Sequence, residues 1–151
     1  NFMTLIQKNK KAYHDYFIIK EYEAGIKLKG SEVKAIRKGS INLKGSFCKI
    51  FKDELFLFDC HISKYKDQNA FDTFEETRDR KLLLKRREIN YLKRELELNQ
   101  GYSIVPTLIY FNDKNTCKLK IALVQGKKTY DKRETQKNKD VQRKLQNKDW
   151  S

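Results

Sequence analysis

Basic residues recur in three places along the chain, with apolar or aromatic residues between them. Lys118 and Lys120 flank Leu119, and two further basic runs lie at 78–87 and 127–133. Over the whole chain, 34 Lys and Arg stand against 20 Asp and Glu, a formal net charge of +14. Lysine and arginine bind phosphate groups and release the counterions held there. The pattern therefore favours a nucleic acid as the partner, ahead of an acidic membrane surface.

Features that the sequence lacks argue against a membrane partner and against duplex DNA. No apolar run approaches the ~20 residues that a membrane-spanning helix needs, and no basic helix has a strongly apolar face. These two observations argue against a membrane partner. The sequence also has no recognition helix of the usual major-groove kind, so folded RNA is favoured over duplex DNA.

Residue types that catalysis or metal binding would need are present without the required spacing. There is no phosphate-binding glycine loop, and His14 and His61 have no cysteine or carboxylate at metal-ligand spacing. Cys60 precedes His61, but neighbours on a strand point to opposite faces, which argues against a nucleophilic pair. Glu75-Glu76 lies in a basic, solvated setting without the apolar pocket that general acid catalysis needs. We predict a protein that is not an enzyme, with no catalytic residue, metal or cofactor.

The three cysteines, Cys48, Cys60 and Cys117, are scattered and form no Cys-x-x-Cys pair. An odd, dispersed set is typical of reduced thiols in an intracellular protein. The segment 1–11 has too few apolar residues for the core of a signal peptide. The first residue is Asn, and the sequence leaves open whether a leader precedes it.

The elements that position the basic residues are organised around residues 23–39. Ala24, Ile26 and Leu28 alternate with small or basic residues, which predicts a half-buried strand. We expect Ser31 to cap a short helix through its hydroxyl oxygen, with Val33 and Ile36 as the apolar stripe. Gly39 is expected to end that helix in a left-handed conformation.

Further strands and one long helix are predicted on both sides of this segment. A separate strand is expected from Tyr16, with Ile18 and Tyr22 on one face. Residues 47–51 and 55–58 form a hairpin around the turn 52–54. A surface loop follows at 66–79, with Phe71 and Phe74 packed against the domain. A helix with apolar positions Ile89, Leu92 and Leu96 is expected to end near 99–101. A strand is then predicted over 102–111, with an edge or bulge at Pro106. The last predicted strand covers 117–124 and has one core face and one basic face.

This count predicts a mainly β fold with helices: a small oligonucleotide-binding-type β-barrel with two to three flanking helices and a basic C-terminal tail. We expect a flexible segment at 1–11, an RNA-binding domain at 12–125 and the tail at 126–151. The tail is rich in Lys and Arg and poor in apolar residues. A segment of this composition is expected to be disordered alone and to become partly helical on a partner.

A series of short motifs runs along nearly the whole chain in one order. They read Asn9-x-x-Ala12-Tyr13-His14-Asp15-Tyr16-Phe17-Ile18, Glu23-Ala24-Gly25-Ile26-x-Leu28-x-Gly30-x-Glu32-Val33-Lys34-x-Ile36-Arg37, Arg78-x-Arg80-Lys81-Leu82-Leu83-Leu84, Arg87-Glu88-Ile89, Val105-Pro106, Tyr110-Phe111, Lys118-x-Lys120-Ile121-Ala122-Leu123 and Gly126-Lys127-Lys128-x-Tyr130-Asp131-Lys132-Arg133. With these motifs the chain resembles the small protein B (SmpB) family, the tmRNA-binding proteins of trans-translation.

The resemblance implies a non-catalytic protein that binds the tRNA-like domain of tmRNA and delivers it to stalled ribosomes. It also implies contacts with the small-subunit rRNA of the decoding centre and the mRNA channel, an indirect encounter with elongation factor Tu on aminoacylated tmRNA, and no membrane partner. The implied location is the cytoplasm of a bacterium, with the stroma of a plastid-like organelle left open. The RNA-binding positions that carry over are Asn9, Glu23, Leu83, Lys85, Lys118 and Lys120. The ribosome and tail positions are Gly126, Lys127, Lys128, Tyr130, Asp131, Lys132 and Arg133.

Two positions depart from the family pattern. Lys85 stands where the family usually has Asn or His, so this contact is expected to be made to phosphate. Glu75-Glu76 replaces an Asp-Pro, so the 66–79 loop is expected to be less rigid. Two other functions stay open: a structural ribosomal or rRNA-binding protein of the same barrel type, and an RNA-modifying enzyme, for which no nucleotide or metal pocket is visible in the sequence.

Overall fold

The computed structural model describes residues 3–64 and 74–127 of the chain. These residues form nine strands and three helices. In chain order they are β1 (Thr4–Lys8), α1 (Lys10–Asp15), β2 (Tyr16–Ile26), α2 (Gly30–Arg37), β3 (Ile41–Asn42), β4 (Phe47–Phe51), β5 (Glu54–Phe58), β6 (His61–Ile62), β7 (Arg80–Leu83), α3 (Arg86–Leu98), β8 (Tyr102–Phe111) and β9 (Cys117–Gly126).

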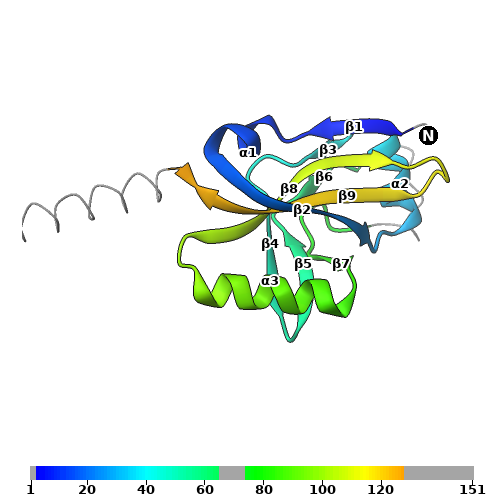
Figure 1. Cartoon of the computed structure of the whole chain (residues 1–151). Coiled ribbons are helices and arrows are strands. Elements are labelled where there is room, and N and C mark those ends of the chain that lie inside the picture. Colours follow the sequence, from blue (N-terminus) through cyan, green and yellow to red (C-terminus); the bar gives the residue numbers. More distant parts are fainter. Residues whose placement is uncertain (1–2, 65–73, 128–151) are drawn as a thin grey trace, which may run out of the picture.

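The main sheet closes on itself. Its strand order is β1-β8-β4-β5-β7-β2-β9, and β9 pairs again with β8, so six strands form a ring and β1 extends it at β8. β3 and β6 form a separate two-stranded sheet. In Figure 1, α3 crosses the lower part of the view, whereas α1 and α2 lie at opposite ends of the upper part. The predicted mainly β architecture with flanking helices is confirmed.

The N-terminal segment is part of the sheet, so the predicted flexible segment at 1–11 is wrong from Thr4 onward. β1 pairs with β8 from Thr4 opposite Phe111 to Lys8 opposite Leu108. The side chain of Gln7 joins β1 to the segment 41–43. Its Nε2 donates to the Ile41 carbonyl at 2.7 Å, and its Oε1 accepts from the Leu43 N–H at 2.6 Å. This order depends on partners far away in the sequence, which local composition does not reveal.

β2 is a single strand of 11 residues, where the sequence suggested two. It pairs with β9 from Tyr16 opposite Gly126 to Gly25 opposite Lys118, with a register shift between Ile18 and Lys20. The irregularity keeps the strand continuous while changing which side chains face the core. β9 accordingly extends two residues beyond the predicted end at Val124.

Helix α2 begins at Gly30, and its N-cap residue is Lys29. The Lys29 N–H donates to Glu32 Oε1 at 2.8 Å, whereas the Ser31 hydroxyl is buried without a hydrogen-bond partner among the described residues. The predicted cap at Ser31 is therefore wrong, because Glu32 reaches back to the cap residue instead. The predicted end is confirmed: Gly39 has φ = +78°, and its N–H donates to the Ile36 carbonyl at 2.8 Å.

Three other sequence predictions are confirmed. β4 and β5 form a hairpin whose two turn residues, Lys52 and Asp53, have φ of +49° and +61°, the signature of a type I′ turn. Helix α3 contains the predicted apolar positions and ends at Leu98. The register of β8 against β9 shifts between Pro106 and Leu108, which places the expected bulge at Thr107.

The core lies inside the ring, and a smaller apolar cluster lies outside it. Leu119, Ile121 and Leu123 of β9 are fully buried inside. On the opposite face, Ala122 and Val124 are also fully buried, because they pack with Ala12 of α1. The predicted basic outer face of β9 is therefore limited to its first half, around Lys118 and Lys120.

Candidate nucleic-acid interface

The outer face of β2, β7 and β9 brings four predicted site residues together. Glu23 of β2 lies opposite Lys120 of β9. One row further along, Gly25 lies between Lys118 of β9 and Leu83 of β7. Cross-strand partners share a face of the sheet, so the two lysines, the carboxylate and the leucine form one surface. We call these four residues, Glu23, Leu83, Lys118 and Lys120, the basic face.

The carboxylate in this face is held by a phenol. Tyr110 of β8 lies opposite Lys118, and its hydroxyl donates a hydrogen bond to Glu23 Oε2. Tyr110 is only 4% exposed, whereas Glu23 is exposed. Burial, and then the hydrogen bond and the charge of Glu23, raise the pKa of Tyr110 above its ordinary value of 10.0. The phenol thus stays protonated as a donor at physiological pH and fixes an acceptor group within a basic surface.

The two lysines differ in their pairing. Lys120 Nζ lies 3.6 Å from Glu21 Oε2, and both side chains are about one-third exposed. An ion pair this exposed contributes little energy, so Lys120 can exchange its partner for a phosphate at low cost. Lys118 has no carboxylate within salt-bridge distance among residues 3–64 and 74–127. Both ammonium groups are therefore available to a polyanion.

Leu83 is an apolar side chain at the surface of this face, 46% exposed. The absence of a side chain at Gly25 matters here, because a Cβ at that position would lie 3.2 Å from Leu83 Cβ. Glycine thus lets Leu83 lie close over β2, next to Lys118. The arrangement offers an unstacked base an apolar surface beside a cation.

Asn9 and Lys85 lie outside the basic face. Asn9 is 8% exposed and caps α1; its Nδ2 donates to the Pro106 carbonyl at 2.9 Å, and its Oδ1 accepts from the Ala12 N–H at 3.4 Å. Its amide holds α1 against the bulge of β8. Lys85 is exposed at the N-cap of α3, two residues after Leu83, and its backbone N–H donates to Glu88 Oε1 at 3.0 Å. Lys85 thus adds an exposed cation close in sequence to Leu83 of the basic face.

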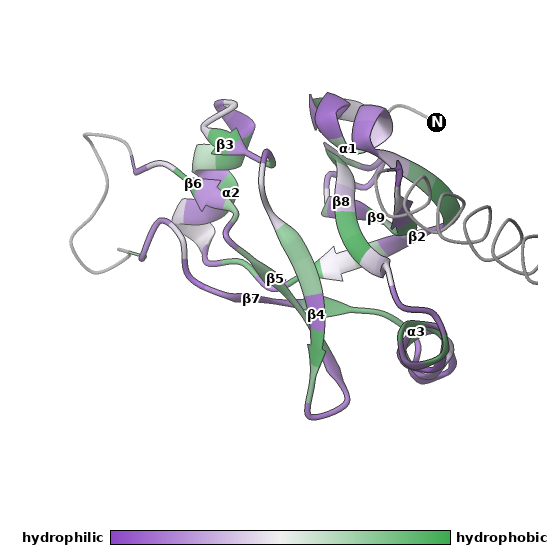
Figure 2. Ribbon diagram, turned by 90° about the vertical axis from the view of Figure 1, so that its left-hand side faces the viewer, coloured by the Kyte–Doolittle hydropathy of each residue, from purple (hydrophilic) through white to green (hydrophobic). Residues whose placement is uncertain are grey.

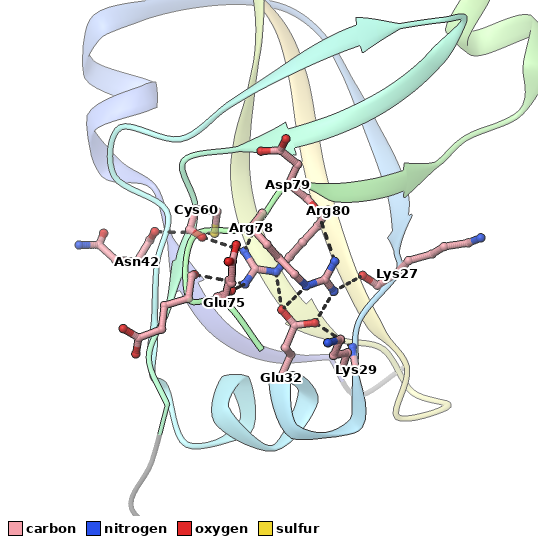
Figure 3. Close-up of polar contacts among 10 residues, drawn as sticks. Lys27, Lys29, Glu32, Asn42, Cys60, Glu75, Arg78, Asp79 and Arg80 are labelled. Atoms are coloured by element: carbon pink, nitrogen blue, oxygen red, sulfur yellow. Dashed lines mark hydrogen bonds and ion pairs between the residues drawn. The ribbon is translucent and has the colours of Figure 1, made fainter. Parts of the chain in front are cut away.

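Two arginines of the basic run at 78–87 bind a buried carboxylate of the protein (Figure 3). Glu32 of α2 and Arg80 of β7 are both fully buried, with Arg80 Nε 2.6 Å from Glu32 Oε2. Arg78 binds the same carboxylate, with its Nε 3.1 Å from Oε2. Arg80 also donates to the Cys60 carbonyl at 2.8 Å. We call Glu32, Arg78 and Arg80 the buried ion cluster.

The electrostatics of this cluster are balanced by hydrogen bonds. Burial by itself would raise the pKa of Glu32, but hydrogen bonds from Arg78, the Lys29 N–H and Arg80 outweigh it and hold the pKa below its ordinary value of 4.5. Sequence composition counted both arginines as surface charge, and this interpretation is wrong for Arg80. The alternation of residues along β7 could have predicted that Arg80 is buried, since Arg80 lies on the same face of the strand as the fully buried Leu82.

The ribosome and tail positions begin where β9 ends. Gly126 is the last residue of β9, opposite Tyr16, and Lys127 Nζ lies 5.5 Å from the centre of the Phe17 ring. The remaining predicted positions lie outside the described residues; they are Lys128, Tyr130, Asp131, Lys132 and Arg133. Phe71 also lies outside them, whereas Phe74 is buried in the core as expected.

The described residues contain no group of three or more His, Cys, Asp or Glu side chains that could hold a metal ion. The cysteines are buried, and desolvation raises the pKa of Cys60 to about 11 and of Cys117 to about 12. These thiols are therefore protonated and unreactive at neutral pH. Among the described helices, none has the length and apolar content to cross a membrane.

Comparison with known proteins gives one family. The family model described as SmpB protein matches residues 6–149. An SsrA-binding protein of Campylobacter hominis is 50% identical over 144 residues, which cover 95% of this chain and 94% of the relative. One from Nitratiruptor is 50% identical over 141 residues, 93% of each chain, and one from Thermosipho africanus is 46% identical over 143 residues, 95% of each chain. A solved structure described as "tmRNA-SmpB: a journey to the center of the bacterial ribosome" is similar with a TM-score of 0.66 and 39% identity, covering 80% of this chain and 83% of the other.

Proposed function

The chain belongs to the SmpB protein family, and from this premise we propose that it binds the tRNA-like domain of tmRNA and delivers it to stalled ribosomes in trans-translation. One observation carries the proposal: 50% identity across 95% of the chain with a protein named for binding SsrA, the tmRNA. The solved relative described as tmRNA-SmpB in the bacterial ribosome supports the same partner and the same setting. The protein would act in the cytoplasm and meet elongation factor Tu indirectly, through aminoacylated tmRNA.

The basic face is the proposed tmRNA contact. Lys118 and Lys120 supply cations for the RNA backbone, and each phosphate that they neutralise releases counterions. Leu83 supplies an apolar surface for a base, and Lys85 supplies a further cation at the start of α3. Asn9 acts by positioning, because its amide already joins α1 to β8. A complete tRNA-like fold is then recognised by shape across several strands.

Glu23 is the proposed specificity element of this face. A carboxylate beside a phosphate backbone is repelled, so it helps binding only where it accepts a hydrogen bond from a base edge or a ribose hydroxyl. Tyr110 occupies one of its oxygens and thereby orients the other. A correctly folded RNA offers a donor at this point, whereas an unrelated polyanion meets an uncompensated negative charge.

The segment from Gly126 onward is the proposed ribosome-binding part, separate from an RNA-binding domain that includes β1. Its residues would lie along the rRNA of the decoding centre and the empty mRNA channel, with Lys127 as the first cation beyond β9. The proposed role needs no reacting side chain, and the protein would act as a non-catalytic adaptor.

Recovery of bound RNA tests the proposal. We expect purification of the protein under mild crosslinking, followed by RNA sequencing, to enrich tmRNA above all other RNAs. The Lys118→Ala/Lys120→Ala double variant is the matched control and should lose most of that enrichment. Constant recovery of rRNA without tmRNA, unaffected by message truncation, would contradict the proposal and favour a structural ribosomal protein.

Truncation tests the division between the two parts. A chain that ends at Lys127 keeps all of β9 and the whole basic face. We expect it to bind the isolated tRNA-like domain with nearly unchanged affinity but to fail in tagging peptides on ribosomes stalled at a message end. Loss of RNA affinity in this truncated chain would show that the two parts are not separable.

A further inference from the structure

The outer face of the β4–β5 hairpin has an unusual composition. Phe47 lies opposite Phe58, and Lys49 lies opposite Phe56. The alternate residues Cys48, Leu55 and Leu57 are buried in the core, so the phenylalanines point the other way. Phe47, Phe56 and Phe58 belong to neither apolar cluster, and Phe51 is 60% exposed at the end of β4. Four phenylalanines thus gather outside the core, three of them half-buried and Phe51 exposed. A partly exposed apolar group of this kind marks a candidate binding surface.

The rings are held in a fixed arrangement. Phe47 and Phe58 stack with ring centres 5.6 Å apart and an interplanar angle of 16°. Phe56 lies 6.4 Å from Phe58 at 56°. The hairpin projects from the body of the molecule in Figures 1 and 2, and Figure 2 shows hydrophobic strands that lead to a hydrophilic tip. A preorganised set of rings on a projecting hairpin can meet a partner without reordering its side chains.

The charges around the rings favour RNA over an apolar protein. Lys49 Nζ lies 5.3 Å from the centre of the Phe47 ring, and Lys52 Nζ lies 5.5 Å from that of Phe51. In the described part of the chain, neither lysine has a carboxylate within salt-bridge distance, whereas the two hairpin carboxylates are neutralised. Lys93 lies 2.7 Å from Asp53, and Arg86 lies 2.7 Å from Glu54. The face therefore combines flat rings with unpaired cations, the combination that binds unpaired bases and their phosphates.

The cavity beside the hairpin points to the same ligand. A space of about 630 Å³ is lined by Phe47 and Lys49 of β4, by Leu96 and Glu97 of α3 and by Tyr102 of β8. The space is larger than one base needs, and aromatic residues of β4 and β8 line it. A base that leaves the stack on the hairpin can therefore enter it, with Lys49 at its edge.

We propose that the β4–β5 hairpin is a second RNA-binding surface, which stacks unpaired bases on its phenylalanine rings and holds their phosphates with Lys49 and Lys52. The surface adjoins the basic face at β7, where Lys81, two residues before Leu83, lies opposite Phe56. The two lysines of the basic face lie further away on β9, which β7 and β2 separate from β5, and which β8 separates from β4. The protein would thus bind a folded RNA over β2, β7 and β9 and a single-stranded RNA segment over β4 and β5 at the same time. This goes beyond the proposed function and does not depend on which folded RNA the basic face takes.

A ring-to-aliphatic substitution separates stacking from simple apolar contact. The double variant Phe51→Leu/Phe56→Leu keeps apolar side chains on the hairpin but removes two stacking surfaces. Phe17→Leu is the matched control, because Phe17 is also an exposed phenylalanine of a strand with a lysine over its ring. Thermal unfolding of each variant shows whether the fold is intact. Lys49→Ala is a third variant whose side chain contributes nothing to the core.

The assay uses a fluorescent 10-nucleotide RNA without secondary structure, added to protein already saturated with a tRNA-like-domain RNA. We expect the wild type and Phe17→Leu to bind the oligonucleotide, and Phe51→Leu/Phe56→Leu to bind it about tenfold or more weakly by anisotropy. Lys49→Ala should reduce the slope of log affinity against log salt by about 0.7, the value for one lost phosphate contact on a single strand. None of the hairpin variants should change the affinity for the tRNA-like domain, so failure here is distinguishable from failure of the proposed function.

Two outcomes would overturn the proposal. One is equal oligonucleotide binding by the wild type and the folded double leucine variant, because it would mean that the rings do not stack on bases and that an apolar protein partner is the better occupant. The other is displacement of the oligonucleotide by the tRNA-like-domain RNA in proportion to its occupancy, because a single shared surface would then account for both ligands.

Discussion

The basic face and the buried ion cluster use the same residue types for opposite purposes. In the basic face, Glu23 and Lys120 lie opposite each other at the surface, and their charges can be rearranged around a ligand. In the buried ion cluster, Glu32 and Arg80 are fully buried and held by hydrogen bonds to each other and to backbone groups. The difference shows that net charge predicts a polyanionic partner without showing which charges are free to meet it. Whether a charged side chain is free depends on which face of its strand it occupies, the core face or the solvent face.

The largest expected effect comes from removing the charge at the centre of the buried ion cluster. Glu32→Gln leaves Arg80 charged, fully buried and without a counterion. Loss of one partner in such a pair costs about 3–5 kcal/mol of the free energy of unfolding. Urea denaturation of the purified variant measures this loss.

The matched control makes the same substitution in the surface region. Glu21→Gln breaks the 3.6 Å pair with Lys120, whose two side chains are each about one-third exposed. It should cost at most about 1 kcal/mol. Losses of similar size in the two variants would mean that burial does not distinguish the two regions energetically.

The buried ion cluster should also give the protein an acid-sensitive stability. The pKa of Glu32 is lower in the folded chain than its ordinary value of 4.5, so its contribution is complete above that pH and decreases as the pH falls toward the folded value. The free energy of unfolding of the wild type should therefore fall more steeply below pH 4.5 than that of Glu32→Gln, which has no carboxylate to protonate. Urea titrations between pH 3 and pH 6, with steps of about half a unit, measure both slopes. Parallel profiles would assign the acid sensitivity to other carboxylates.

Several elements of the fold could be predicted because their signals are local. Helix α3 has apolar residues at helical spacing, β9 alternates lysines with core residues, and the 52–53 turn joins two apolar runs. β1 could not be predicted, because it is ordered by its pairing with β8 and by the hydrogen bonds of Gln7 to Ile41 and Leu43. Secondary-structure propensity and hydrophobic pattern depend on residues that are close in sequence, whereas this strand is stabilised by partners more than 30 residues away.

The candidate site divides in the same way. The outward position of Lys118 and Lys120 follows from alternation alone, and their shared face is confirmed by the register of β9. The grouping with Glu23 and Leu83 needs two further strand registers, which no single stretch of sequence contains. The hydrogen bond from Tyr110 to Glu23 joins residues 87 positions apart, and it had no signal in the sequence.

The basic face should respond to loss of a charge in affinity rather than in stability. Lys118→Ala should weaken binding of the tRNA-like domain and reduce the slope of log affinity against log salt by about one unit. Its free energy of unfolding should stay within about 0.5 kcal/mol of the wild type, because a partly exposed lysine without an ion pair among the described residues contributes little to folding. Filter binding at four salt concentrations measures the slope.

Arg94→Ala is the control for this charge loss, since Arg94 is an exposed arginine of α3 that does not belong to the basic face. It should leave the salt slope nearly unchanged. An unchanged slope for Lys118→Ala as well would place this lysine away from the phosphates, and an equal decrease for both variants would indicate only a general attraction to the net charge.

The smallest expected effect tests how the carboxylate of the basic face is held. Tyr110→Phe removes the hydroxyl that donates to Glu23 and little else, so the free energy of unfolding should fall by about 1 kcal/mol or less. The cross-strand partner of the released carboxylate is Lys120, a cation. Pairing between the two would withdraw both an acceptor and a cation from the RNA, and affinity for the tRNA-like domain should fall about threefold, a modest loss for a pair this exposed. A double-mutant cycle decides whether this is the reason: Lys120→Ala should cost less affinity in the Tyr110→Phe background than in the wild type, because the lysine is already engaged there. Strictly additive losses would show that the phenol acts on RNA directly and does not keep Glu23 and Lys120 apart.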